Sequence, residues 1–245
     1  MPTKTQGSVG DEGPVPSLVD DTLVRDLPST PRGVRTREAL VAAARRVFER
    51  DGFIDSRLVD ITTEAHCSTG TFYTYFDSKD EALTAVLQAA QDDMMHPGMP
   101  HVDEDPDNSA AIIAAANRAY LDAYRRNAKL MQLLEQVATI DPVFRELRLA
   151  RSRAFAERSS RRIAWMQANG YANPALDPLM TSRALAGMTS RMAYLALALE
   201  EGWDLEQVAH TITHLWLSAL GVADHHGPSD PSTRSHHHQA SQEER

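Results

Sequence analysis

The side chains best placed to do chemistry lie between residues 68 and 79, where hydroxyl groups and aromatic rings alternate along the chain. Phe72 and Phe76 are four residues apart, so in a helix they share one face. Thr69, Tyr73 and the other polar side chains of the run then point away from that face. Hydroxyl groups donate hydrogen bonds to phosphate oxygens, which position a protein on a nucleic acid. The run therefore predicts a helix that rests on a core through two phenylalanines and touches a phosphate backbone.

A second short helix is predicted immediately before this run. Leu58, Ile61, Thr62 and Ala65 recur at i, i+3, i+4 and i+7, which forms one inward face. Ser68 then offers a hydroxyl oxygen to the unpaired amides at the start of the following helix. Two short helices joined by a tight turn are the arrangement of a helix-turn-helix.

Helices are also predicted on both sides of this motif. From Thr36, apolar residues recur with helical spacing until Gly52, where a glycine stop is expected. Asp77 or Ser78 caps the start of the next helix, whose first turn carries Lys79. A cation at a helix N-terminus is unfavourable for the helix dipole, so its presence indicates an anionic partner.

The remainder of the chain is predicted to be helical after a loop. Prolines and a glycine between residues 96 and 107 predict that loop and a domain boundary. Helical spacing then marks residues 112–124 and 130–137, a helix from Asp141 to Gly170 with Pro142 in its first turn, and two long helices over 177–201 and 204–222. The last two helices are apolar on more than one side, so we expect them to pack against a second copy of the chain.

Composition excludes several classes of protein. The chain has 245 residues, a formal net charge of −9 and one cysteine, Cys67. One cysteine permits neither an intramolecular disulfide nor a multi-cysteine metal site, which fits a reducing, cytoplasmic setting. Acidic residues near the N-terminus replace the apolar run of a signal peptide, and we expect no membrane span. The negative charge argues against a nucleic-acid-binding surface over the whole molecule but is compatible with a local one.

Residues 36–83, about a fifth of the chain, resemble the TetR family of one-component transcriptional regulators. The matching elements are Ala43-Ala44 with Phe48 and Gly52, then Asp60-Ile61, and finally the run from Ser68 to Asp80 with its Gly, aromatic pairs and Ser-Lys-Asp at the family spacing. This resemblance implies a DNA-binding helix-turn-helix domain followed by a helical domain that differs widely between family members.

The turn between the two short helices departs from the family pattern. It has Ala65-His66-Cys67-Ser68 where the family usually has Ala-Gly-Val-Ser, and Thr62 stands where the family prefers Ala. Glycine serves at this turn because the helix end requires a left-handed conformation, which His66 tolerates better than most residues. We expect Cys67 to be a buried filler rather than a redox sensor, and the turn to survive at a modest cost in stability.

The resemblance implies DNA contacts for residues in and around the second helix of the motif, namely Arg57, Thr69, Gly70, Thr71, Tyr73, Thr74, Tyr75 and Lys79. Tyr73 and Lys79 would hold phosphates. Thr69 and Gly70 would approach the major groove, because a position without a side chain lets the helix end come close. Arg32, Arg35 and Arg37 would add backbone or minor-groove contacts.

The expected architecture is all-α, with an N-terminal three-helix helix-turn-helix DNA-binding domain and a C-terminal helical domain for ligand binding and dimerisation. The expected parts are a disordered acidic tail (residues 1–30), the DNA-binding domain (31–95), the effector and dimerisation domain (96–222) and a disordered histidine-rich tail (223–245).

The expected function is that of a ligand-responsive repressor, which binds a palindromic operator as a homodimer and is released by a small apolar or acyl-coenzyme A type effector. The alternative is a DNA-binding or protein-interaction factor without a small-molecule effector. The sequence has no nucleophile–base pair, no phosphate loop and no metal motif, so we expect no enzyme, no cofactor and no metal.

Several residues of the second domain have two open interpretations. Methionines and aromatics there are mostly core, but some are candidates for an effector pocket: Tyr120, Tyr124, Met131, Phe144, Trp165, Met188 and Met192. Arginines between residues 145 and 162 are favoured as a solvated face, the alternative being a pocket lip that pairs with a carboxylate or phosphate. His210 and His214 are spaced to grip a metal, although a dimer-face or core role is favoured.

Overall fold

The computed structural model describes residues 28–95 and 109–222, and within these ranges the chain is helical, without a strand. The helices are α1 (Pro31–Asp55), α2 (Leu58–Glu64), α3 (Thr69–Tyr75), α4 (Lys79–Met95), α5 (Ser109–Ile140), α6 (Pro142–Ala168), α7 (Pro178–Ala193) and α8 (Leu205–Leu220), with a π-helical segment η3 (Tyr194–Ala198) directly after α7. The expected all-α fold is confirmed. The predicted loop before α5 and the predicted tails, apart from residues 28–30, lie outside the described residues.

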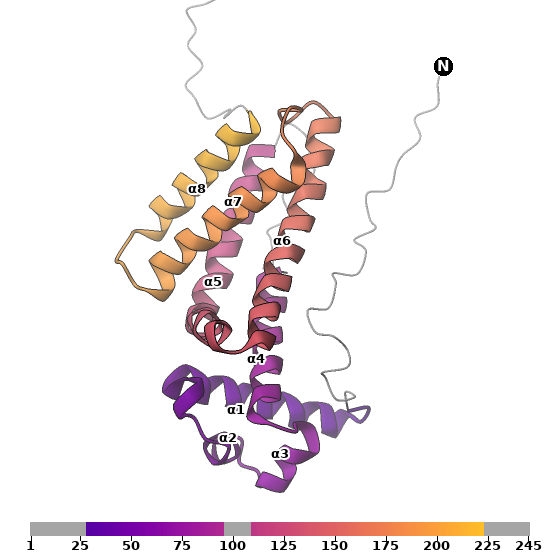
Figure 1. Cartoon of the computed structure of the whole chain (residues 1–245), viewed down its shortest axis with the longest axis vertical. Coiled ribbons are helices and arrows are strands. Elements are labelled where there is room, and N and C mark those ends of the chain that lie inside the picture. Colours follow the sequence, from indigo (N-terminus) through magenta and orange to yellow (C-terminus); the bar gives the residue numbers. More distant parts are fainter. Residues whose placement is uncertain (1–27, 96–108, 223–245) are drawn as a thin grey trace, which may run out of the picture.

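Helix α4 joins the two parts of the molecule (Figure 1). Helices α1, α2 and α3 lie together at one end, and α4 rises from them toward α5 and α6, with α7 and α8 beyond. Helix α4 packs against α1 as well as against α5 and α6. One hydrophobic core continues from Val47 and Phe72 in the first part to Leu134 and Ile212 in the second. A displacement of α4 therefore acts on both parts.

Helix α1 begins at Pro31 rather than at the predicted Thr36. The Thr30 side chain accepts a hydrogen bond from the Gly33 amide at 3.1 Å, and proline suits the first position of a helix. Gly52, the predicted stop, interrupts the helix with a φ of 76°, and one further turn follows it. Gly52 thus ends the regular part of the helix as expected, but α1 continues for one more turn to Asp55.

The helix-turn-helix has the expected local structure. The Ser68 hydroxyl oxygen accepts a hydrogen bond from the Thr71 amide at 3.1 Å and so caps α3. His66 has a φ of 52°, the left-handed conformation expected at the turn. Phe72 and Phe76 are both fully buried. Helix α3 is therefore anchored on one side and presents the other side outward.

One helix replaces two predicted ones in the second part. Residues 112–124 and 130–137 both belong to the continuous α5, because the chain between them has no proline or glycine. Asn127 is buried in that stretch, and its side-chain amide donates to the Ala123 carbonyl (2.9 Å) and to Asp93 of α4 (2.7 Å). The mostly polar residues 125–129, which separate the two predicted helices, therefore continue α5 within the helix bundle.

The last two predicted helices are present with a change at the end of the first. Asp177 caps α7, but regular α-helix stops at Ala193, and in η3 the Leu199 amide donates to the Tyr194 carbonyl at 3.1 Å. Helix α8 ends at Gly221, which has a φ of 70°. None of the helices in residues 28–95 and 109–222 has the length and apolar character needed to span a bilayer.

Candidate DNA-binding surface and ligand cavity

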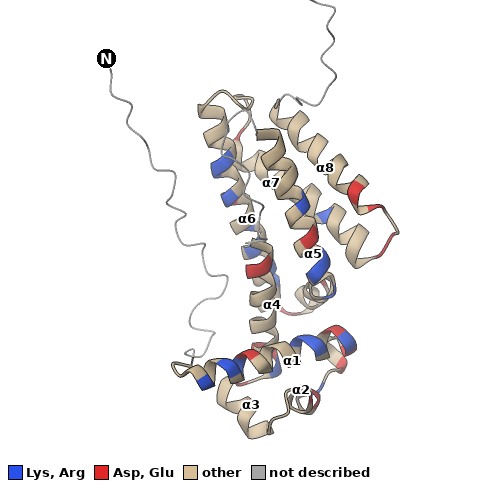
Figure 2. Ribbon diagram, turned by 180° about the vertical axis from the view of Figure 1, so that it is seen from behind, with Lys and Arg blue, Asp and Glu red and all other residues tan. Residues whose placement is uncertain are grey.

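The outward side of α3 consists of uncharged polar groups. Thr69, Gly70, Tyr73 and Thr74 are exposed, and Tyr73 is 51% exposed with its ring edge-on to Phe72. The other two candidates within α3, Thr71 and Tyr75, are half-buried. In Figure 2 the ribbon of α3 is tan throughout, because α3 contains no charged residue, and it lies at the end of the molecule opposite the second part. Thr69, Gly70, Tyr73 and Thr74 thus form one accessible surface, which we call the α3 surface.

Two threonine hydroxyls of the α3 surface are engaged within the helix. Thr71 Oγ1 lies 3.0 Å from Ser68 Oγ, and Thr74 Oγ1 donates to the Gly70 carbonyl at 3.1 Å. These bonds stabilise the helix locally and fix the side-chain rotamers. A phosphate or base contact by either threonine would have to share or replace such a bond.

Gly70 is not required by the packing of the protein. A Cβ atom built at this position would meet only Ser68 Oγ, at 3.7 Å, which is ordinary van der Waals contact. Its backbone is also outside the left-handed region that favours glycine. Glycine is an unfavourable helix former, so its presence on an open surface needs another cause. Close approach of a partner to the backbone of α3 is one such cause.

Most arginines of the first part are neutralised by neighbouring acids, among them Arg45–Glu49, Arg46–Glu64, Arg50–Asp51 and Arg57–Asp60. In the last pair, Arg57 donates to Asp60 through Nε (3.0 Å) and Nη2 (2.9 Å), and these bonds hold the pKa of the Asp60 carboxyl below its usual value. Arg32 and Arg35, at the start of α1, are exposed and form no ion pair within the described residues.

Arg37 is packed against the protein rather than directed outward. Its guanidinium lies 5.2 Å from the centre of the Phe76 ring, and burial lowers its pKa. Three N-terminal arginines were predicted to contact DNA. Arg37 instead packs on Phe76 at the end of α3.

The structure gives Lys79 partners that the sequence did not indicate. Its ammonium group donates to the carbonyl oxygens of Phe53 (2.6 Å) and Ser56 (2.8 Å) and lies 4.4 Å from the centre of the Phe53 ring. These contacts tie the start of α4 to the end of α1. An anionic partner is thus not required by the position of Lys79, contrary to the expectation from the helix dipole. A phosphate contact by Lys79 stays a prediction.

Cys67 is half-buried and packs against the hydrophobic core. Burial raises the pKa of its thiol, so the reactive thiolate is disfavoured. The geometry agrees with a filler at the turn and gives no support to a redox sensor.

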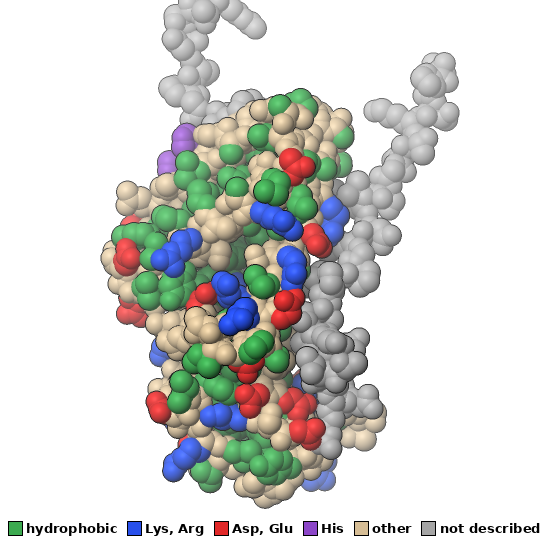
Figure 3. Space-filling view, viewed as in Figure 1, with side chains coloured by type: hydrophobic (Ala, Val, Ile, Leu, Met, Phe, Trp, Pro, Cys, Tyr) green, Lys and Arg blue, Asp and Glu red, His purple; other side chains and the backbone are tan. Residues whose placement is uncertain are grey.

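A cavity of about 380 Å³ lies in the second part, between the end of α4 and the helices α5, α6 and α7. Its walls combine apolar and aromatic side chains with three arginines, Arg148, Arg151 and Arg191, and one acid, Glu135. Figure 3 shows Lys and Arg side chains gathered on the face over α6 and α7. Arg148 and Arg151 line this cavity, which favours the alternative interpretation, a pocket lip, over a solvated face for these two arginines.

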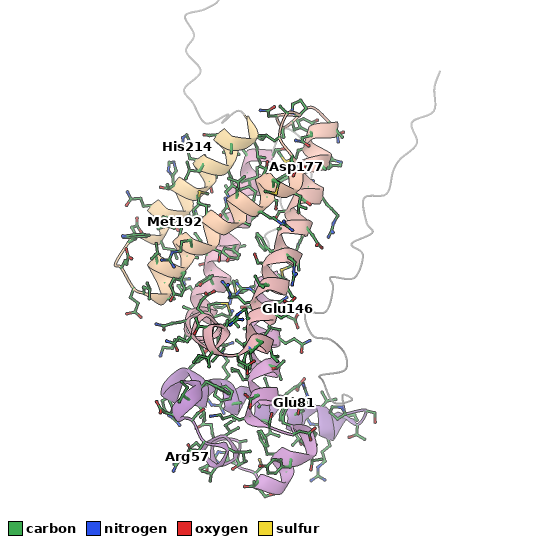
Figure 4. The ribbon with its side chains drawn as sticks, in the orientation of Figure 1. Arg57, Glu81, Glu146, Asp177, Met192 and His214 are labelled. Atoms are coloured by element: carbon green, nitrogen blue, oxygen red, sulfur yellow. The ribbon has the colours of Figure 1, made fainter. Side chains whose placement is uncertain are left out.

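Only part of the predicted effector pocket lines this cavity. Tyr120 and Tyr124 line it, and the sulfur of Met131 lies just behind the wall, 2.7 Å from an Arg151 nitrogen. The remaining candidates lie elsewhere: Phe144 meets Phe53 of the first part (ring centres 6.1 Å apart), Trp165 stacks on Tyr171, and Met188 and Met192 pack on the core from α7 (Figure 4). Helical spacing assigns residues to a face, but it does not say which neighbour that face meets.

The cavity also has walls that sequence reasoning missed. Met94 and Met95, the last residues of α4, line it together with Phe155 and with Tyr194 at the start of η3. No local signal in the sequence marks the two methionines as lining residues. Their position matters because α4 is the helix that joins the two parts.

A polar network ties α1, α4 and α5 together beside the cavity. Arg45 donates to the Arg126 carbonyl at 2.7 Å, and the Arg126 side chain pairs with Asp93 at 2.8 Å. Asn127 also donates to Asp93. Hydrogen bonds from Arg126 and Asn127 hold the pKa of the Asp93 carboxyl below its usual value. The network links α1 and α4 of the chain to α5.

His210 and His214 are exposed on the outward side of α8, and Figure 4 shows His214 pointing away from the bundle. A core role is thereby excluded. No cluster of three or more potential metal ligands occurs among the described residues. The dimer-face interpretation stays a prediction.

The fold is that of a helix-turn-helix protein with a helical second domain. The family model of the bacterial regulatory proteins of the tetR family matches residues 40–86. The chain is 26% identical over 208 residues to the HTH-type transcriptional regulator EthR of Mycolicibacterium smegmatis, covering 78% of this chain and 92% of that protein. Residues 40–86 therefore match the DNA-binding domain of the tetR family, and most of the chain is similar to a transcriptional regulator that contains such a domain.

Solved structures have the same fold. A putative TetR-family transcriptional regulator from Rhodococcus sp. superposes with a TM-score of 0.64 at 16% identity, covering 76% of this chain and 98% of that one. The SmeT–triclosan complex superposes with a TM-score of 0.62 at 21% identity, covering 76% of this chain and 91% of that one. At these identities the likeness concerns the fold alone.

Proposed function

We propose that the protein is a ligand-responsive repressor that binds a palindromic operator as a homodimer and leaves it when a small effector binds. In this proposal residues 31–95 bind DNA, and residues 96–222 bind the effector and dimerise. The α3 surface carries the proposal, because it presents hydroxyl groups, a phenol and a glycine without a packing role on an exposed helix. Each α3 would enter a major groove, with the two half-sites about 34–36 Å apart.

Exposed apolar groups on α7 and α8 support the dimer. Met180 is 62% exposed and Leu215 is 43% exposed in the single chain. His210 and His214, also on α8, are exposed as well. A second copy related by a two-fold axis would cover these groups and set the distance between the two α3 helices.

Helix α4 provides the mechanical link between effector and DNA. Its start is tied to α1 through Lys79, and its end forms part of the cavity through Met94 and Met95. A ligand that enlarges or reshapes the cavity would displace α4 and change the spacing of the α3 helices. Release from DNA requires that the ligand binds more tightly to the non-binding spacing than to the binding one.

The alternative, a DNA-binding factor without an effector, is disfavoured by the cavity. Its volume of about 380 Å³ lies within the range of about 300–1,000 Å³ usual for small-molecule sites. The structurally similar SmeT binds triclosan. We therefore favour a ligand-responsive regulator, without assigning triclosan to this protein.

The test of DNA binding is a Tyr73→Ala variant. A duplex selected by the wild-type protein from a random pool is titrated with each protein in a gel-shift experiment. Loss of a hydrogen bond to a charged phosphate in each protomer should weaken binding at least about tenfold. Tyr171→Ala, the same change far from α3, is the control and should leave affinity unchanged, provided that thermal melting shows both variants folded. Equal binding by Tyr73→Ala and wild type would refute the contact.

A further inference from the structure

We infer that the effector is an apolar molecule with a carboxylate group, which pairs with Arg151 inside the cavity. This inference rests on the proposed function, in which the cavity holds the effector. The sequence predicts a small apolar or acyl-coenzyme A type effector, and the inference restricts this class to organic acids.

Arg151 is a cation with poor partners. Its guanidinium donates from Nη1 to the Met131 sulfur (2.7 Å) and from Nη2 to the Met94 sulfur (3.3 Å), and it forms no ion pair within the described residues. A thioether is a weak hydrogen-bond acceptor, whereas a guanidinium has five donors arranged for a carboxylate. A half-buried arginine between two sulfurs in a cavity wall is therefore ready to exchange them for an anion.

The other two arginines of the cavity already have partners, so Arg151 is the one that remains to bind an anionic ligand. Arg148 pairs with Glu135 at 3.4 Å, and Arg191 lies over the Tyr194 ring, 5.3 Å from its centre. Three arginines against one glutamate give the lining a formal charge of +2. A neutral or cationic effector would leave that charge uncompensated, but a carboxylate would reduce it.

The rest of the lining suits an apolar body. Tyr120, Tyr124 and Phe155 form a connected aromatic group, with ring centres 6.0 Å apart for the first pair and 5.4 Å for Tyr120 and Phe155. The two phenol hydroxyls make no hydrogen bond within the described residues. Burial raises the pKa of Tyr124, so its hydroxyl stays protonated and can donate to an anion.

The size of the cavity favours a free acid over an acyl-coenzyme A thioester. About 380 Å³ is near the lower end of the usual range for small-molecule sites, so the nucleotide portion of coenzyme A would have to lie outside. A carboxylate also fits the guanidinium as a bidentate partner. A medium-length aliphatic acid combines both properties.

The same contact would couple the ligand to DNA binding. Arg151 touches Met94, which lies at the end of α4. A carboxylate is the stronger acceptor, so it would draw the guanidinium away from this sulfur and free the end of α4. A neutral ligand of equal size would leave the contact in place.

The test uses three probes with the same aliphatic chain: decanoate, 1-decanol and decyltrimethylammonium, each below its aggregation threshold. Calorimetry measures their affinity for wild type, Arg151→Met and the control Arg161→Met, whose arginine is exposed on the same helix and does not line the cavity. Wild type and the control should bind decanoate at least about tenfold more tightly than decanol, and Arg151→Met should lose this preference while still binding decanol. Methionine keeps an unbranched apolar side chain between the two sulfurs, and circular dichroism checks folding.

Four results would overturn the inference. Equal affinity for decanoate and decanol in wild type, or preference for the cation, would exclude an anionic effector while leaving ligand-regulated DNA binding intact. If Arg151→Met still binds decanoate more tightly than decanol, Arg151 does not bind the carboxylate. Failure of every probe to bind wild type would refute an aliphatic acid in this cavity. The proposed DNA-binding function has its own test: it is refuted if the wild-type protein selects no duplex from the random pool.

Discussion

Replacing Gly70 by alanine should make the protein more stable and at the same time weaken its binding to DNA. The Cβ of Gly70→Ala would meet only Ser68 Oγ, at 3.7 Å, so nothing in the protein opposes the added methyl group. Alanine is also a better helix former than glycine by about 1 kcal/mol in a helix interior. Most single substitutions destabilise, so an opposite sign for stability and binding is a specific outcome.

The magnitudes follow from the position of Gly70 in α3. It is the second residue of a seven-residue helix, where only part of the helix preference applies, so we expect a gain of about 0.5 kcal/mol. For a domain of this size that corresponds to a rise in melting temperature of about 1–2 °C. If DNA lies against the α3 backbone, the methyl group should cost at least about 1.4 kcal/mol of binding free energy, or about tenfold in affinity.

Thermal melting and gel shift on the same preparations are the assays. Gly187→Ala, assayed without effector, is the control, because Gly187 is also helical and has nothing within 4 Å of an added Cβ. Gly187 lies in the wall of the cavity on α7 and not on α3. This variant should gain stability without losing DNA affinity. A destabilised Gly70→Ala would show that the α3 surface is not open there, and unchanged DNA affinity would show that no partner approaches this backbone.

Two further predictions concern strain and charge. His66→Gly should stabilise the turn by about 0.5–1 kcal/mol: a left-handed φ of 52° costs a non-glycine residue about 1–2 kcal/mol, and the greater freedom of glycine in the unfolded chain offsets part of that gain. Glu200→Gly, at a φ of 53°, is the comparison, and a lower melting temperature for His66→Gly would contradict the reasoning. Asp93 has a lowered pKa, so its contribution to stability is complete above the usual aspartate value of about 3.9 and is lost as pH falls below it. Urea unfolding between about pH 5 and 3 should therefore show a weaker pH dependence in Asp93→Asn than in wild type, and equal slopes would refute this.

The DNA-binding part was largely predictable because its signals are local. The Ser68 cap, the left-handed His66 and the buried Phe72 and Phe76 depend on residues a few positions apart, and all four have the expected structure. The turn chemistry and the helical spacing that predict them act within one or two turns of chain.

The cavity and the role of Lys79 were not predictable in the same way because they depend on long-range packing. Lys79 bonds to carbonyls more than twenty positions earlier, and Arg151 meets Met94 from a different helix. Phe144 has the spacing of a lining residue but turns to Phe53, since the start of α6 meets the DNA-binding part. Amphipathic spacing defines which face is buried and leaves the identity of the covering element open.

The π-helical segment η3 should tolerate the gain or loss of a residue better than α7, which precedes it. The α7 residues that line the cavity recur at helical spacing: Ala186, Gly187, Ser190 and Arg191. Tyr194, the last lining residue, begins η3. Loss of one residue upstream, inside α7, would rotate every later lining position by about 100° about the helix axis. Loss of one residue between 195 and 198 would convert the wider turn toward a regular one and leave the lining untouched. Related sequences should therefore gain or lose a residue at η3 far more readily than anywhere in α7.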